Sequence, residues 1–538
     1  MEGISYHRMM KKVLLWLLLL SVIGLIDSSI LTYRHFSTFV PPCTNHILFA
    51  DCGKVLSSTY SVVYGVPLAM IGVFYYGVIA IITIITVTKV IVGQSKKPLF
   101  SYLLIIIPTI GFLSSLYFIF LQVFVIKAIC LYCMLSALTS TLLFITTQLY
   151  FRRERHILFL KLLALGYRCI LKKIFFIFDP EFVHNRLTSS GERMGRNNLI
   201  KHVFASVLEV RDSSLEQVIH GVTYPTPIGL AAGFDYEGKL TQILPSLGFG
   251  FHTIGTITNH AYKGNPGPML GRLPQSRSLM VNKGFKNLGA EKTAHKLSHL
   301  HFDIPVGISI GRTNTLDLKT QKESIKDIIK AFKIFEKSQI KHTYYELNIS
   351  CPNLYGDITF YPPQNLKELL IEIDKLKLKK PVYIKMPIEK SNEEVLDMLE
   401  VISQHSPVGV IFGNLQKNRH DPAFVQNEVR KFHVGNFSGK PTYQRSNELI
   451  ELAYRHYAQR FTIIGCGGVF NAHDAYKKIT LGASLIQLIT GMIFEGPQLI
   501  AQINLELMEL LAEDGFTHIY EAVGSRNSPY GGFRKCFT

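Results

Sequence analysis

Four long apolar stretches in the first 151 residues constrain this chain more than any other feature. They cover residues 13–31, 55–88, 98–126 and 128–151, and only the first contains a charged residue, Asp27. A helix needs about 20 mostly apolar residues to cross the hydrocarbon core of a bilayer. The sequence therefore predicts four membrane-spanning helices. Because three spans follow the first stretch and no small-residue cleavage site does, we do not expect a cleaved signal peptide.

The density of charged residues changes near residue 151. Up to that point the chain has nine Lys/Arg and three acidic residues, out of 57 and 39 in the whole chain. The averages of 48% hydrophobic and 18% charged residues therefore combine a nearly uncharged part with a part of ordinary soluble composition. We predict a four-span domain at 1–151, a linker at 152–200 and a soluble domain at 201–538.

The distribution of Lys and Arg over the predicted loops sets the expected topology. Loops rich in these residues are usually cytoplasmic, and their alternation here places both chain ends in the cytoplasm. The 32–60 loop and the turn at Lys127 then face the outer side. Part of the net charge of +18 marks these cytoplasmic loops, and many acidic residues accompany the basic ones further on, so we expect no nucleic-acid partner.

Four cysteines fall on the predicted outer side: Cys43, Cys52, Cys130 and Cys133. A structural disulfide or buried thiols would be the simplest interpretation of one pair. Zinc would need four closely placed ligands, which suits the end of a membrane helix poorly, so no metal is expected. Two pairs on one membrane face favour a relay, in which one pair exchanges with a partner and passes electrons to the other.

This part of the chain resembles the bacterial, disulfide-forming branch of the vitamin K epoxide reductase family. The resemblance rests on Cys43, Cys52, Ser57-Ser58, Tyr64-Gly-Val-Pro67 and Cys130-Leu-Tyr-Cys133, within about residues 10–150. It implies that Cys133 lies nearest a quinone, that Cys130 exchanges with the loop pair, and that a thioredoxin-like protein reduces the loop pair. One of Ser57 and Ser58 would hydrogen-bond the quinone. The expected location is the inner, cytoplasmic membrane.

Basic and apolar residues alternate in the linker at 152–200. As a helix it would be amphipathic with aromatic anchors and would suit a membrane interface, although a solvated linker helix is the alternative. Asp179-Pro180-Glu181 has the pattern of a helix start, with Asp as the cap and Pro in the first position.

Eight short apolar runs alternate with helical patterns from residue 228 onwards. This alternation predicts a parallel sheet, and eight repeats predict a (β/α)₈ barrel, with a doubly wound sheet as the alternative. The predicted strands are 228–234, 251–258, 306–311, 344–350, 382–387, 409–414, 462–468 and 485–490.

The carboxyl ends of these strands, where barrel enzymes carry their active sites, are polar or rich in glycine. Gly467-Gly468 and Thr490-Gly491 follow the last two strands, a usual place for a phosphate. The pattern predicts a phosphorylated cofactor such as FMN, while single glycines there would only indicate tight turns. In Asn348-Ile-Ser-Cys351-Pro-Asn353, two carboxamides flank a thiol that becomes a general base if a cation such as Lys385 lowers its pKa. A packed cysteine in a loop is the alternative.

From about residue 179 to 524 the chain resembles dihydroorotate dehydrogenase. The residues that carry the resemblance are Gly229-Leu-Ala-Ala-Gly-Phe-Asp235, Leu247-Gly-Phe-Gly-Phe251, Gly255-Thr-Ile-Thr258, Gly264-Asn-Pro266, Arg272-Leu-Pro274, Asn348-Ile-Ser-Cys-Pro-Asn353, Ile464-Gly-Cys-Gly-Gly468 and Gly482-Ala-Ser484. Asp179-Pro-Glu181 and the basic segment before it resemble the membrane-associated, quinone-using class, in which that segment forms the mouth of a quinone tunnel.

This resemblance implies oxidation of dihydroorotate, a step of pyrimidine biosynthesis, with FMN as cofactor and a membrane quinone, ubiquinone or menaquinone, as acceptor. Cys351 stands at the catalytic-base position, where the quinone class has Ser and the soluble class has Cys. Asn348, Asn353 and Asn414 match substrate-binding residues. The matches to FMN-binding residues are Ala232, Gly233, Thr256, Lys385, Gly467, Gly468, Thr490 and Gly491.

Five positions depart from the family pattern: Tyr236 for Lys, Val281 for Asn, Ser309 for Asn, Leu415 for Ser/Thr and Ile489 for an aromatic residue. Loss of polar partners weakens a site that hydrogen-bonds its substrate. Two alternatives to a bifunctional oxidoreductase therefore stay open. One is a flavoenzyme for another small substrate with the spans as an anchor, and the other is a non-catalytic binding protein.

Overall fold

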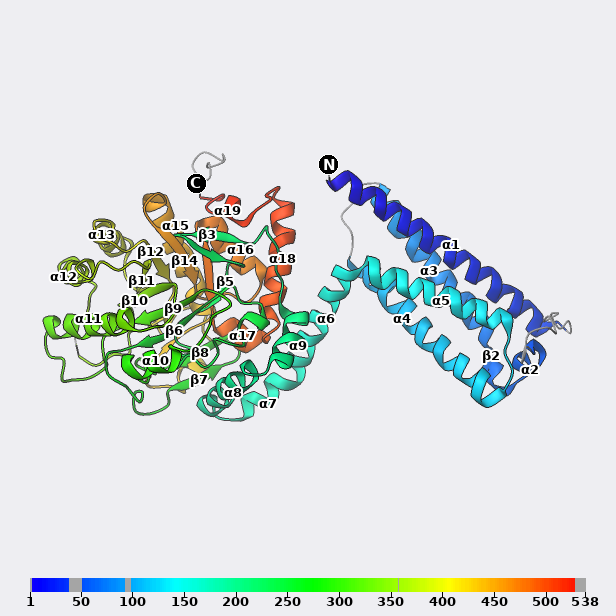
Figure 1. Cartoon of the computed structure of the whole chain (residues 1–538), viewed down its shortest axis with the longest axis horizontal. Helices are drawn as coiled ribbons and strands as arrows, with labels where there is room; N and C mark the ends of the chain where they lie inside the picture. Colours follow the sequence, from blue (N-terminus) through cyan, green and yellow to red (C-terminus); the bar gives the residue numbers. More distant parts are fainter. Residues whose placement is uncertain (1, 38–50, 92–97, 357, 528–538) are drawn as a thin grey trace. The chain divides into compact units, whose positions relative to one another are not determined.

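The computed structural model of the chain describes residues 2–37, 51–91, 98–356 and 358–527 (Figure 1). It divides into two compact units, Met1–Phe159 and Leu160–Thr538.

The first unit is a bundle of four long helices, as predicted. They are α1 (Glu2–Phe36), α3 (Leu68–Ile91), α4 (Pro98–Phe120), which continues as a π-helix over Leu121–Ile126, and α5 (Leu131–Tyr150). All four are long and apolar enough to cross a membrane. Leu17, Ile79, Leu104 and Leu143 are fully buried where the helices pack together, while many other apolar side chains of the bundle are exposed, as lipid-facing residues would be.

The start of the second span was predicted wrongly. The helix begins at Leu68 instead of residue 55, because residues 52–67 form a short helix α2 (Cys52–Leu56) and a two-stranded hairpin. The hairpin joins β1 (Val62–Val63) to β2 (Val66–Pro67) through Tyr64 and Gly65, whose φ angles of 48° and 81° are incompatible with a helix. Asp51 caps α2 by accepting the Lys54 N–H at 2.9 Å.

The second unit begins with a series of amphipathic helices. They include α7 (Lys172–Ile177), α8 (Pro180–Gly195) and α9 (Asn198–Leu208). Asp179 caps α8 by accepting the Phe182 N–H at 2.8 Å, with Pro180 in the first turn, as predicted. The exposed apolar side chains of this region include Leu162, Leu163, Leu165, Ile170, Leu171, Ile174, Ile177, Phe178, Phe182, Leu187, Leu199 and Val203.

Eight parallel strands close into a barrel, which confirms the predicted fold. In barrel order they are β10 (Tyr344–Asn348), β11 (Val382–Met386), β12 (Gly409–Phe412), β14 (Thr462–Cys466), β15 (Leu485–Leu488), β5 (Ile228–Leu230), β6 (Phe251–Ile257) and β9 (Val306–Ile310). Helices such as α11 (Gln321–Lys337) and α12 (Pro363–Asp374) lie outside the strands (Figure 1).

The strands end one to four residues earlier than predicted. The backbone leaves the sheet at Gly413 (φ 139°), Gly467 (φ 100°) and Gly468 (φ 71°), so the polar carboxyl ends become loops. A separate three-stranded sheet consists of β7 (Leu270–Leu273), β8 (Ser278–Val281) and β13 (Asn436–Phe437). Val281 is the last residue of β8, so the segment that follows it leaves from this sheet.

Candidate active sites

Polar side chains from neighbouring barrel strands meet at their carboxyl ends. Asn348, the last residue of β10, pairs in register with Lys385 of β11. Its amide donates to Thr256 Oγ1 at 2.8 Å, and its oxygen accepts the Ser350 N–H at 3.2 Å. Asn414 donates to the Ser350 carbonyl at 2.7 Å. The structure therefore brings together four predicted site residues from separate strands: Asn348, Lys385, Thr256 and Asn414.

Asn353 lies in a second group of carboxamides. Its amide donates to the Val281 carbonyl at 3.0 Å, and its side-chain oxygen accepts from Asn436 at 2.7 Å. Asn265 donates to the Asn353 carbonyl at 2.9 Å and to Asn282 Oδ1 at 3.1 Å. Sequence reasoning did not nominate Asn265, Asn282 or Asn436. Asn265 lies in the Gly264-Asn-Pro266 motif, and Asn282 follows Val281, which departs from the family pattern. No local pattern indicates Asn436.

Cys351 is a partly exposed free thiol between these two groups in the sequence. Burial raises its pKa to about 11, although the Asn353 N–H and the charges of Lys385, Lys417 and Arg312 act in the opposite direction. Lys385 therefore acts on Cys351 in the expected direction, but the pKa of the thiol is not lowered on balance. Desolvation of the thiolate outweighs the nearby positive charges.

The glycines after β14 and β15 pack too closely for side chains. A Cβ at Gly491 would lie 1.9 Å from the Val469 carbonyl oxygen, and one at Gly467 would lie 2.5 Å from Thr442 Oγ1. Thr490 Oγ1 lies 2.8 Å from Ser438 Oγ. Bare backbone beside hydroxyl groups fits a phosphate group, which needs close access to N–H donors. On this observation, the residues fit the phosphate of FMN.

Two of the departures line this end of the barrel in different ways. Ser309 Oγ contacts Thr256 Oγ1 at 2.9 Å and so joins the Asn348 network. Ile489 Cδ1 would be the nearest neighbour of a Cβ on Gly233, at 3.8 Å, so an apolar side chain faces this glycine. Ala232 is buried beside it.

A cavity of about 380 Å³ opens between helix α7 and residues of the barrel domain. It is lined by Lys172, Lys173, Phe176, Ile177, Pro274 and Phe494. Arg272 lies 4.6 Å from the Phe176 ring centre and donates to the Phe178 carbonyl at 2.6 Å. Apolar rings with basic side chains around them suit an apolar ligand that enters from a membrane interface.

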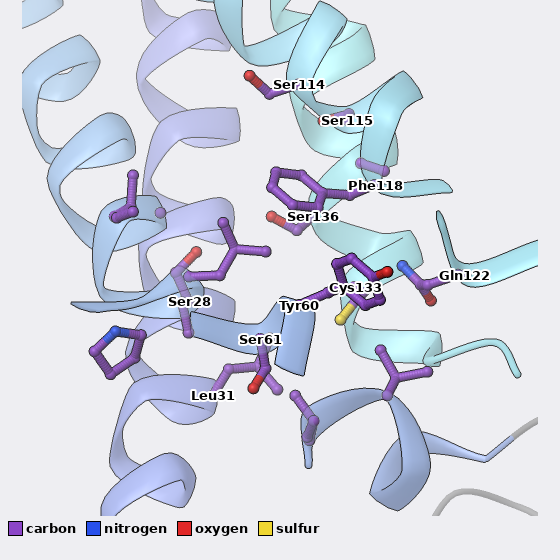
Figure 2. Close-up of a pocket in the computed structure, with 18 of the residues that line it drawn as sticks. Ser28, Leu31, Tyr60, Ser61, Ser114, Ser115, Phe118, Gln122, Cys133 and Ser136 are labelled. Carbon is purple, nitrogen blue, oxygen red and sulfur yellow. The ribbon is translucent and has the colours of Figure 1, made fainter. Parts of the chain in front are cut away.

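The helical bundle contains a larger cavity of about 580 Å³ with mainly apolar walls. Cys133 lines it together with several hydroxyl groups, among them Ser28, Tyr60, Ser61 and Ser136 (Figure 2). Ser57 and Ser58, both nominated from the sequence, also line it. The cavity therefore offers a redox-active thiol and several hydrogen-bond donors to an apolar ligand.

Cys130, the second thiol of the pair, has different surroundings from Cys133. It is fully buried, does not line the cavity, and packs with Cys52 and Val55 in one apolar cluster. The Asp51 N–H donates to the Ile129 carbonyl at 3.0 Å, which ties α2 to the Cys130 turn. Cys52 is disulfide-bonded, whereas Cys130 and Cys133 are free thiols. Cys43 lies outside the described residues.

Comparison with known proteins identifies two families in this chain. The model of the family described as dihydroorotate dehydrogenase matches residues 214–511, and that of the vitamin K epoxide reductase family matches residues 15–148. Both resemblances read from the sequence are thus confirmed, and the chain carries the two domains in succession.

Individual relatives match the second region. A dihydroorotate dehydrogenase (quinone) of Trichodesmium erythraeum is 31% identical over 383 residues, which cover 67% of this chain and 99% of the relative. One of Nostoc punctiforme is 33% identical over 357 residues, covering 64% and 93%. The crystal structure of DHODH from Eimeria tenella in complex with ferulenol is 25% identical, with a TM-score of 0.57 over 65% of this chain and 96% of that one.

Proposed function

Because this chain belongs to the dihydroorotate dehydrogenase family, we propose that its barrel oxidises dihydroorotate to orotate and passes the electrons to a membrane quinone. The observation that carries the proposal is the convergence of Asn348, Asn414 and Lys385 with Thr256 at the carboxyl ends of neighbouring strands. Cys351 follows directly in the loop after β10. A flavoenzyme for another small acid is the competing candidate, favoured by Tyr236 and Val281.

Cys351 is the proposed general base. Its thiolate removes a proton from the substrate carbon next to the one that loses a hydride, so that a C–H proton ends on Sγ. Asn348, Asn353 and Asn414 present carboxamides that bind a flat substrate through its N–H and C=O groups. Their own hydrogen bonds to Thr256, Asn436 and Ser350 fix the orientation of these side chains.

FMN is the proposed cofactor, held by Ala232, Gly233, Thr256, Lys385, Gly467, Gly468, Thr490 and Gly491. When bound, it would accept the substrate hydride and supply two electrons to quinone. Lys385 contributes a buried positive charge beside the Asn348 network. The cavity bounded by Phe176 and Phe494 is the proposed entry for the quinone, because its basic rim suits anionic lipid and its rings suit an isoprenoid compound.

The direct test is the absorbance spectrum of the full chain purified in detergent. We expect a flavin spectrum that dihydroorotate bleaches in the absence of oxygen and that added quinone restores. A flavin that dihydroorotate leaves unchanged would refute the proposed substrate and favour another small acid. Absence of flavin after purification with added FMN would favour a binding protein instead.

The pH dependence of this bleaching follows from the pKa of Cys351. The thiolate is the active form, and with a pKa of about 11 its fraction falls as the pH is lowered. Below that pKa the rate constant should rise about tenfold for each unit of pH, because the ionised fraction does. Stopped-flow absorbance over the neutral to mildly alkaline range measures this slope. Reoxidation by quinone, which does not use Cys351, should lack it.

The helical domain supports a second proposed activity, the transfer of electrons from protein thiols to quinone. Cys133 lines the bundle cavity and Cys130 packs against Cys52. In the proposed relay, Cys133 therefore reacts with the quinone and Cys130 exchanges with the loop pair. In the proposed cycle a thioredoxin-like protein reduces the Cys43–Cys52 pair. That pair reduces a Cys130–Cys133 disulfide, and the resulting dithiol gives two electrons and two protons to the quinone.

The proposed location follows from the topology predicted for the loops. The chain would cross the inner membrane four times, with the redox cysteines outside and the barrel in the cytoplasm. Under that topology the two domains would reduce one quinone pool without direct electron exchange, because a hydrocarbon core of ~30 Å would separate outer thiols from a cytoplasmic flavin. We propose that the fusion keeps both domains in the same membrane.

A further inference from the structure

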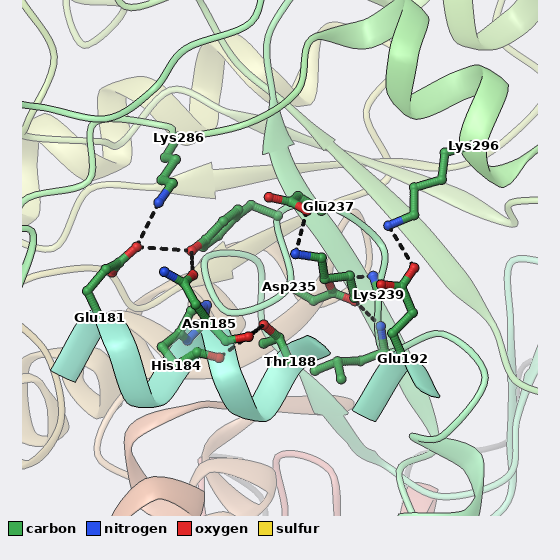
Figure 3. Close-up of polar contacts among 12 residues, drawn as sticks. Glu181, His184, Asn185, Thr188, Glu192, Asp235, Glu237, Lys239, Lys286 and Lys296 are labelled. Atoms are coloured by element: carbon green, nitrogen blue, oxygen red, sulfur yellow. Dashed lines mark hydrogen bonds and ion pairs between the residues drawn. The ribbon is translucent and has the colours of Figure 1, made fainter. Parts of the chain in front are cut away.

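An ion cluster connects helix α8 to the barrel. Glu181, in the first turn of α8, contacts Lys283 Nζ at 3.0 Å and Lys286 Nζ at 2.8 Å. Figure 3 shows Glu181 on α8 facing Lys286. Lys283 is only 7% exposed, so its ammonium group is almost completely removed from water. A buried charge without a partner is costly, and Lys283 therefore depends on Glu181 for its position.

Aromatic side chains complete the surroundings of Lys283. Its Nζ donates to Tyr236 Oη at 3.1 Å and lies 4.5 Å from the centre of that ring. His184, also on α8, stacks on Tyr236 with ring centres 5.3 Å apart. Tyr236, one of the departures from the family pattern, thus takes part in holding a buried cation supplied by a different segment.

The segment that carries Lys283 also holds Asn353. Val281, two residues earlier, accepts the Asn353 amide through its carbonyl. Asn282, directly before Lys283, accepts from Asn265, which in turn donates to the Asn353 carbonyl. Displacement of Lys283 would therefore move two of the groups that fix Asn353.

We propose that Glu181 is a positioning residue, which fixes Lys283 and the 281–283 segment so that Asn353 is aligned to bind the substrate. The proposal rests on the proposed function, in which Asn353 is a substrate ligand. It couples α8, which exposes Phe182 and Leu187, to substrate affinity in the barrel.

The charges around Lys283 give the sign of its pH effect. Burial lowers the Lys283 pKa to about 8, Glu181 and Glu237 oppose this, and Lys286 adds to it. Of the other groups on these elements, Lys239 pairs with Glu237, Asp235 accepts backbone N–H groups, and burial lowers the His184 pKa to about 3. Without Glu181, Lys283 would lose its proton at a lower pH, and the segment would lose its ion pair.

The test compares Glu181→Gln with Glu192→Gln in the full chain. Glu192 lies on the same helix and makes an ion pair with Lys296 at 3.1 Å (Figure 3). Neither residue belongs to the 281–283 segment or hydrogen-bonds to Asn353. Glu181→Gln should raise the KM for dihydroorotate about tenfold, the effect of losing one partner of a buried charged pair, with a smaller change in kcat. The alkaline limb of its kcat/KM profile should move to lower pH. Glu192→Gln should leave both quantities unchanged.

A second variant separates positioning from folding. Lys283→Met, which removes the buried charge itself, should raise the KM to a similar extent and keep its FMN, and Glu181→Asp should restore part of the affinity. Equal KM values and pH profiles for the Glu181 and Glu192 variants would overturn the proposal. A wild-type chain whose flavin dihydroorotate does not bleach would overturn the proposed function, and this inference with it.

Discussion

Replacing Cys351 by alanine should lower the rate of flavin reduction by dihydroorotate by a factor of about 10² to 10⁴, the usual contribution of a general base. Alanine keeps most of the side-chain volume in a loop whose asparagines are held by other partners. The variant should therefore retain its FMN and bind orotate normally. Rapid-mixing absorbance gives the rate, and orotate titration of the flavin spectrum gives the affinity.

Cys351→Ser is the matched control for this substitution. Serine retains a group that can give up a proton, and it is the residue that the quinone-using class is expected to carry at this position. The serine variant should recover part of the activity that alanine loses. An alanine variant as fast as wild type would show that Cys351 is not the base.

Replacing Cys133 by alanine should abolish quinone reduction by thiols while leaving quinone reduction by dihydroorotate intact. Cys133 is the thiol of the pair that lines the bundle cavity, and without it the Cys130–Cys133 disulfide of the proposed cycle cannot form. The two activities are measured on the same detergent preparation, with a reduced thioredoxin-like protein or dihydroorotate as electron donor. Loss of both activities with intact FMN would contradict independent operation of the domains.

Cys169→Ala provides the control for thiol chemistry. Cys169 is a free, exposed cysteine in the helices before the barrel, and it lines neither cavity. Its removal should change neither activity. Cys130→Ala should also abolish thiol-dependent reduction, because Cys130 is the member of the pair that packs against Cys52.

The elements that were predicted correctly have strong local patterns. Uncharged stretches of about 20 residues predict spans because of bilayer thickness, and apolar runs between amphipathic helices predict buried parallel strands. The predicted boundaries of helices and strands were less accurate where apolar residues form turns. Residues 55–67 are as apolar as a span, but Tyr64 and Gly65 form a hairpin before Leu68.

Only the part of the candidate site that lies at the ends of predicted strands could be predicted. Asn348, Lys385 and Asn414 end successive strands, and strand ends of a barrel must meet at one rim. Asn436 reaches Asn353 from a separate sheet 83 residues further along the chain, which no local pattern encodes. Whether a cation lowers the pKa of Cys351 could not be decided from the sequence, because burial of the thiol depends on the whole fold.

The raised pKa of Cys351 has a consequence for the durability of the protein. Peroxides and alkylating agents attack thiolates, and near neutral pH nearly all of Cys351 is the protonated thiol. The same burial that limits its ionisation therefore slows its conversion to sulfenic and sulfinic acids. A chain that includes a domain of a disulfide-chemistry family thus keeps Cys351 in a form that resists oxidation.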